Sequence, residues 1–132
     1  MIVKFQVGTT ERACMIDITQ RVRRAVQESG VREGVCQVYV PHTTAGIIVN
    51  EGADPAVVQD ILAQLDRFVP WGGNYQHREG NSAAHIKAAL VGHAATVFVD
   101  EGALALGTWQ AIFFCDFDGP RQREVWVKVV AD

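Results

Sequence analysis

The chain has 132 residues, of which 48% are hydrophobic and 20% are charged, and its formal net charge is −3. This balance excludes a disordered chain, and the small negative charge provides no electrostatic footprint for nucleic acid or for an anionic membrane. We therefore expect one cytoplasmic domain over residues 1–132, because no stretch is long and apolar enough for a membrane span and the N-terminus lacks a secretion signal.

The first third of the chain predicts two strands followed by a helix. Val3, Phe5 and Val7 alternate with polar residues, as in a half-buried strand, and an apolar run at 13–16 follows a turn. Asp17 or Thr19 is expected to begin a helix that Gly30 ends. Its expected buried stripe consists of Ile18, Val22, Ala25 and Val26.

The central stretch places polar groups where predicted strands and a helix end. Residues 35–40 form an apolar run that Pro41 terminates, and 46–49 predict a second strand. Asp54 and Pro55 are typical of a helix start, and the helix is expected to run to Phe68. Its expected buried stripe consists of Val58, Ile61, Leu62, Leu65 and Val69.

The remainder predicts a long polar loop, a short helix and a β-rich end. The loop covers 70–81, and a helix begins at Asn81 or Ser82 and ends at Gly92. Strands are predicted at 96–99, 102–106, 108–117 and 123–130, and the last two are expected to form an antiparallel hairpin. Together these elements predict a single β-rich α+β domain with mainly antiparallel, sandwich-like sheets and about three helices.

Three cysteines, Cys14, Cys36 and Cys115, lie in apolar runs with no C-x-x-C spacing. This pattern is typical of small core residues in a reducing compartment, and a lone nucleophilic cysteine is the less favoured alternative.

Three of the four histidines, His42, His77 and His85, come from three different element ends. If they converge, they could bind a zinc or another divalent ion with one position left open for water or substrate. Without a metal, the same rings could act as acid, base and phosphate donor. The alternative for each is a hydrogen-bonded structural histidine. His93 follows a predicted helix end and is left out of this group.

A second group of residues is suited to binding an anion. Ser82 opens a helix, where free N–H groups attract phosphate, and Thr43, Thr44 and Arg121 add hydroxyl and guanidinium donors. The sequence contains neither a Walker motif nor a dinucleotide fingerprint. Three carboxylates could act as acid/base or magnesium groups, or equally as solvated caps: Glu51, Asp116 and Asp118.

The order and spacing of five short blocks resemble the YjbQ family over essentially the whole chain. The blocks are Pro41-His42-Thr43-Thr44-Ala45-Gly46, Asn50-Glu51 with Asp54, residues 77–87 from His77 to Lys87, Leu106-Gly107-Thr108-Trp109-Gln110, and Phe117-Asp118-Gly119-Pro120-Arg121. One departure is Asp116, which stands where the family pattern suggests Glu.

The resemblance implies a β-rich homotrimer with sites near subunit junctions. It also implies, for at least some members, a weak thiamine-phosphate synthase activity, in which hydroxymethylpyrimidine diphosphate and thiazole phosphate combine and pyrophosphate leaves. His42, His77, His85 and Glu51 would then be catalytic, with Thr43, Thr44, Asn50, Ser82, Lys87, Thr108, Gln110 and Arg121 binding substrate or phosphate.

Two other functions remain open from the sequence. One is a His-bound zinc or magnesium centre in a hydrolase or isomerase of unknown substrate. The other is a non-catalytic trimer that binds a small phosphorylated metabolite. None of the three readings involves nucleic acid or a membrane as partner.

Overall fold

The computed structural model describes residues 1–132 and contains eight strands and three helices, so the predicted α+β domain is confirmed. None of the helices is long and apolar enough to cross a membrane. In chain order the elements are β1 (Ile2–Gly8), β2 (Cys14–Asp17), α1 (Thr19–Ser29), β3 (Gly34–Tyr39), β4 (Ala45–Glu51), α2 (Pro55–Phe68), α3 (Ser82–Val91), β5 (Ala94–Asp100), β6 (Ala103–Leu104), β7 (Gln110–Asp116) and β8 (Gln122–Ala131).

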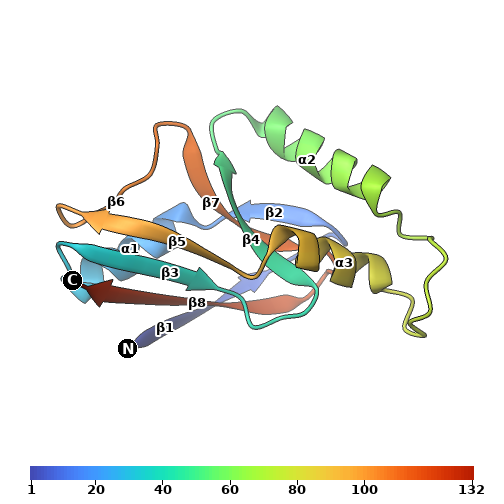
Figure 1. Ribbon diagram of the computed structural model, residues 1–132, viewed down its shortest axis with the longest axis horizontal. Coiled ribbons are helices and arrows are strands. Elements are labelled where there is room, and N and C mark those ends of the chain that lie inside the picture. Colours follow the sequence, from blue (N-terminus) through green and yellow to red (C-terminus); the bar gives the residue numbers. More distant parts are fainter.

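The strands form two antiparallel sheets. The larger sheet has the order β1-β8-β3-β5-β6, and the smaller one has the order β2-β7-β4. Figure 1 shows α3 lying beside β4 and α2 standing away from the larger sheet, joined to α3 by the long loop. The main core fills the space between the two sheets and α1, and a second cluster lies between the smaller sheet and α3.

β7 is the strand that joins the two cores. Ile112 and Phe114 face the main core, whereas Phe113, Cys115 and the neighbouring Phe117 face α3. Because both faces are covered, every residue of Ala111–Phe117 is buried, and this explains the continuous apolar run in the sequence.

The helix ends follow from their capping residues. Gly30 closes α1 in the left-handed conformation at φ 70°, which glycine adopts without a Cβ penalty. At the start of α2 the Asp54 carboxylate accepts a hydrogen bond from Ala56 N at 2.9 Å, and Pro55 occupies the first helical position. The predicted end of α1 and both predicted ends of α2 are confirmed, whereas the N-cap of α1 is Ile18 and not Asp17 or Thr19.

The predicted hairpin between the last two strands is wrong. β7 pairs with β2 and β4 in the smaller sheet, whereas β8 pairs with β1 and β3 in the larger one. The turn at 118–121 therefore carries the chain from one sheet to the other. β7 also begins later than expected, at Gln110, and β6 contains only two residues.

The predicted buried stripe of α2 is only half-buried. Val58, Ile61, Leu62 and Leu65 keep part of their surface exposed, and only Val69, just beyond the helix, is buried. The reason is that α2 lies at the margin of the smaller sheet and has no second layer over it.

Candidate functional site

The turn between β7 and β8 is built on a buried ion pair. Asp116 is fully buried and contacts Arg123, whose Nη2 lies 3.1 Å from Asp116 Oδ1. The same Nη2 donates to Thr44 Oγ1 at 2.8 Å, and Thr9 Oγ1 donates to Asp116 Oδ2 at 2.7 Å. A buried charge pair with satisfied hydrogen bonds is rigid, so these residues hold the turn in place.

Glycine is required inside this turn. A Cβ on Gly119 would lie 2.2 Å from the carbonyl oxygen of Glu11, and the Gly119 amide donates to Arg12 O at 3.0 Å. The turn is therefore packed directly against the loop before β2.

Asp118 connects the turn to the start of α3. Asn81 Nδ2 donates to Asp118 Oδ2 at 2.9 Å, and the Arg121 guanidinium lies 3.4 Å from the same oxygen. Two predicted anion-binding features, Arg121 and the helix start at Ser82, are thus brought together. The Arg121 side chain is 55% exposed, but part of its donor capacity is taken by Asp118.

The start of α3 opens into a polar pocket. Ser82 and Ala83 occupy the first two helical positions, whose N–H groups have no partner inside the helix. The pocket has a volume of about 510 Å³ and is lined by Asn74, Tyr75, Gln76, His77, Ser82, His85 and Ile86. His77 and His85 meet edge to face, with ring centroids 5.3 Å apart. Two of the three predicted histidines therefore converge.

His42 is held by the larger sheet rather than by the other two histidines. Its Nε2 accepts a hydrogen bond from the backbone N–H of Glu124 at 2.9 Å. Burial, followed by the positive charge of Arg123, lowers the pKa of His42. The neighbouring Thr43 is exposed, and Thr44 is buried against Arg123.

The structure does not support a metal centre formed by the three histidines. No group of three or more His, Cys, Asp or Glu side chains is arranged to hold a metal ion. In addition, the lone pair of His42 Nε2 is occupied by the Glu124 amide. The cysteines offer no thiolate either, because burial raises the pKa of all three and places that of Cys36 at about 11.

Four predicted site residues lie at the other end of the smaller sheet. In the β4–β7 ladder Ala45 is opposite Asp116, whereas Glu51 is opposite Gln110 six residues further along β4. At ~3.3 Å per residue the two ends of β4 are about 20 Å apart. Asn50, Glu51, Thr108 and Gln110 are therefore separated from the turn, and Thr108 and Gln110 line a smaller pocket with Asp17, Thr19 and Arg23.

Lys87 has a structural role instead of a free ammonium group. Its side chain is almost fully buried and its Nζ contacts the Asp66 carboxylate of α2. Because the ammonium group is committed to this pair, Lys87 is not available to the pocket at the start of α3.

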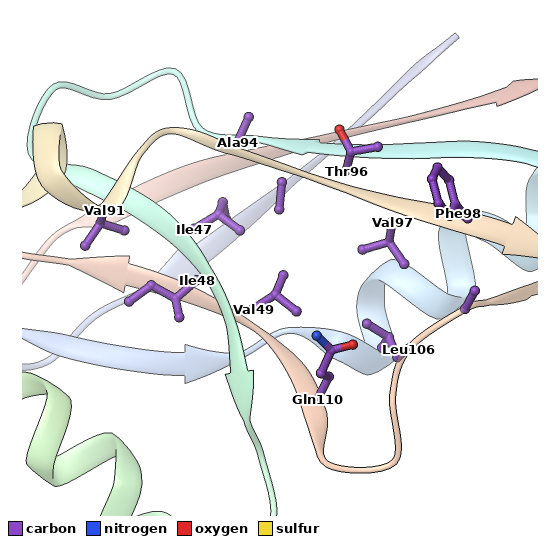
Figure 2. Close-up of a pocket in the computed structure, with 12 residues that line it drawn as sticks. Ile47, Ile48, Val49, Val91, Ala94, Thr96, Val97, Phe98, Leu106 and Gln110 are labelled. Carbon is purple, nitrogen blue, oxygen red and sulfur yellow. The ribbon is translucent and has the colours of Figure 1, made fainter.

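The largest apolar groove lies elsewhere, between the exposed edge of β4 and β5. Figure 2 shows Ile47 and Val49 of β4 opposite Val97 of β5 and Leu106, with Gln110 at one side. The groove has a volume of about 480 Å³ and only two of its twelve lining residues are polar. It lacks the convergent polar groups expected of a catalytic site.

Sequence reasoning missed the contacts of three residues in the turn network, namely Thr9, Arg123 and Asn81. Arg123 falls in phase with the inward-facing Val125 and Val127 of β8, so its burial and its need for a partner were readable from the alternation. Asn81 is predicted to lie at a helix start with free backbone N–H groups, but its side chain contacts Asp118 and its Oδ1 is buried without a hydrogen-bond partner. No sequence signal indicates that contact.

The family assignment follows from comparison with known proteins. Residues 3–132 match the family model described as "UPF0047 protein YjbQ-like". The chain belongs to the YjbQ (UPF0047) family. A UPF0047 protein of Methanocaldococcus jannaschii is 49% identical over 132 residues, covering 100% of this chain and 96% of the relative. YugU of Bacillus subtilis is 48% identical, with coverage of 98% and 99%.

Solved YjbQ structures share the fold. A crystal structure from Clostridium acetobutylicum superposes with a TM-score of 0.96 at 51% identity, covering 97% of this chain and 99% of that chain. A protein of unknown function from Sulfolobus solfataricus gives a TM-score of 0.96 at 32% identity, with coverage of 100% and 97%. None of these YjbQ relatives is described by an activity, so the function has to be argued from the site.

Proposed function

We propose that this YjbQ protein is a thiamine-phosphate synthase of low turnover, which joins hydroxymethylpyrimidine diphosphate to thiazole phosphate. The observation that carries the proposal is the polar pocket at the start of α3. It combines free helix N–H groups, two imidazoles and the ring of Tyr75 in about 510 Å³, a volume suited to a small phosphorylated molecule.

The reaction needs stabilisation of the leaving group more than it needs proton transfer. The bond between the pyrimidine methylene carbon and the diphosphate oxygen breaks, pyrophosphate leaves with the bonding electrons, and the thiazole nitrogen supplies the pair for the new carbon–nitrogen bond. Preorganised donors aimed at the developing charge lower such a barrier. We assign this role to the N–H and hydroxyl of Ser82, with His77 and His85 as further donors, because these residues line the pocket. Arg121 does not line it, and would reach the phosphate from the neighbouring turn.

Low turnover follows from two features of the site. The protein has no group of three or more His, Cys, Asp or Glu side chains that could hold a metal ion, so any magnesium beside the pyrophosphate would depend largely on the substrate's own oxygens. In addition, Asp118 already holds part of the Arg121 guanidinium and competes with an incoming phosphate. A non-catalytic binder of a phosphorylated metabolite is the second candidate, because it requires only the same pocket. The metal-dependent hydrolase is not proposed, because His42 is bonded to Glu124 and does not join His77 and His85.

We further propose that the working form is a homotrimer in the cytoplasm. The predicted site residues fall into two groups at opposite ends of β4. In a cyclic trimer each copy contacts its neighbour through two different surfaces, so one group could meet the other group of the next copy. The groove between β4 and β5 and the exposed Phe98 are apolar surfaces that a second copy would cover. Three free cysteines agree with a reducing compartment.

Genetic rescue tests the proposed reaction. A bacterial strain lacking its own thiamine-phosphate synthase should grow slowly without thiamine when it expresses this protein. The His85→Ala variant should fail to rescue, and Asp60→Asn, an exposed change on α2, should rescue as well as the wild type. Equal growth with wild type, His85→Ala and empty vector would contradict the proposal.

A further inference from the structure

The strand ladder around His42 explains why its ring is fixed. β3 pairs with β8 up to Tyr39 and Trp126, and the chain then leaves the sheet at Pro41. Two residues before Trp126 in β8, the N–H of Glu124 has no strand partner on that side. The His42 ring takes the place of the missing carbonyl and accepts this N–H through Nε2 at 2.9 Å.

This hydrogen bond determines the tautomer of His42. An amide N–H can only donate, so Nε2 must carry a lone pair and, in the neutral ring, the proton must reside on Nδ1. Nδ1 has no hydrogen-bond partner within the chain and is not sealed from solvent. A ligand that approaches His42 therefore meets an N–H donor.

The surroundings of the ring favour its neutral form. Burial lowers the pKa of His42, and the positive charge of Arg123 lowers it further. The carboxylates of Glu124 and Asp116 raise the pKa, but they act less strongly. Asp116 is paired with Arg123, and the Glu124 carboxylate accepts a hydrogen bond from Trp126 Nε1 at 3.1 Å. Protonation of Nε2 would also break the Glu124 bond.

We propose that His42 is a neutral hydrogen-bond donor that presents Nδ1–H to a phosphate group bound beside the turn between β7 and β8, outside the residues that line the pocket at the start of α3. It is then neither a general base nor a metal ligand, because both roles need a free lone pair. The Glu124 backbone and Arg123 are positioning groups that act through His42. The identity of the acceptor rests on the proposed function, whereas the tautomer rests only on the contacts of the ring.

The test is nuclear magnetic resonance of the histidine side chains in the ¹⁵N-labelled full-length protein. Long-range correlations distinguish protonated from unprotonated ring nitrogens, and loss of signals in His42→Gln assigns the ring. We expect His42 to show the Nδ1–H tautomer and to become protonated at a lower pH than an ordinary histidine, whose pKa is near 6.5. An Nε2–H tautomer, or protonation near the ordinary pKa, would overturn the proposal.

Two further arms test the positioning groups and the ligand. Glu124→Ala keeps the backbone N–H and should leave the tautomer unchanged, whereas Glu124→Pro removes the N–H and should allow the ring to exchange tautomers. Addition of millimolar inorganic pyrophosphate should shift the Nδ1–H proton of the wild type. A Nδ1–H signal that does not respond overturns the donor role, while a response without synthase activity contradicts only the proposed reaction.

Discussion

At the level of single residues, Asp118 and an anionic ligand would compete for the same guanidinium group of Arg121. The carboxylate touches both Asn81 and Arg121, so it orders the turn but also neutralises the cation. An incoming phosphate has to displace this contact, and bidentate geometry then favours Arg over Lys.

We expect opposite effects from changes on the two sides of this contact. Arg121→Lys keeps the positive charge but loses the bidentate hydrogen-bonding geometry of the guanidinium, and should weaken pyrophosphate binding by about ten-fold. Asp118→Asn removes the competing charge and should strengthen binding several-fold. Calorimetry with pyrophosphate measures both, and Arg24→Ala, an exposed change on α1, is the matched control. No change in affinity for Arg121→Ala would remove Arg121 from the site.

The lowered pKa of His42 predicts how the stability of the protein depends on pH. The pKa of His42 is lowered in the fold, so the unfolded chain takes up a proton near pH 6.5 that the folded ring does not. The free energy of unfolding therefore decreases as the pH falls through that value. Urea unfolding between about pH 5 and pH 8 should show a smaller decrease for His42→Gln than for the wild type. Identical pH dependence of the two proteins would mean that the folded ring is not perturbed.

At the scale of elements, α2 depends on a few contacts with α3 and the smaller sheet. None of the residues of α2 is fully buried, and the ammonium group of Lys87 in α3 contacts the carboxylate of Asp66 in α2. A buried ammonium group needs a partner, so this pair attaches the helix to the domain.

Removing either side of the Lys87–Asp66 pair should have different consequences. Asp66→Ala leaves the buried ammonium unpaired and should lower the free energy of unfolding by about 1–3 kcal/mol. Lys87→Met fills the same space with an apolar side chain and should lower the free energy of unfolding by less than Asp66→Ala does. Chemical denaturation measures both, with Asp60→Ala on the exposed side of α2 as control. An Asp66→Ala variant with unchanged stability would show that water supplies the hydrogen bonds that Lys87 needs.

The elements also show what local sequence patterns can and cannot predict. Caps such as Asp54 and Gly30 determine helix ends through contacts within a few residues, and those ends were predicted. The assignment of β7 and β8 to different sheets depends on pairing with β1 to β4, which lie far away in sequence, so the predicted hairpin was wrong. Asp118 contacts both Arg121 and Asn81, which directly precedes Ser82, whereas Glu51 lies at the far end of β4 from the turn. Such distances between element ends are set by the sheet pairing and not by local sequence.

At the scale of the whole molecule, the separation of the two groups of site residues predicts an obligate oligomer. Light scattering should give the mass of a trimer at micromolar concentration, and a monomer would contradict the assembly. Glu51→Ala and His85→Ala should each be inactive alone. If the two ends of neighbouring copies form one site, refolding the two variants together should restore part of the activity. No restoration would place the whole site within one chain.

If the pocket at the start of α3 carries out thiamine-phosphate synthesis, the purified protein should form the product itself. Wild type supplied with hydroxymethylpyrimidine diphosphate and thiazole phosphate should form thiamine phosphate and pyrophosphate slowly and in equal amounts. His85→Ala should lose this activity while its melting temperature stays nearly unchanged. Product formation at the same rate by His85→Ala, or none above background by the wild type, would contradict the proposed function.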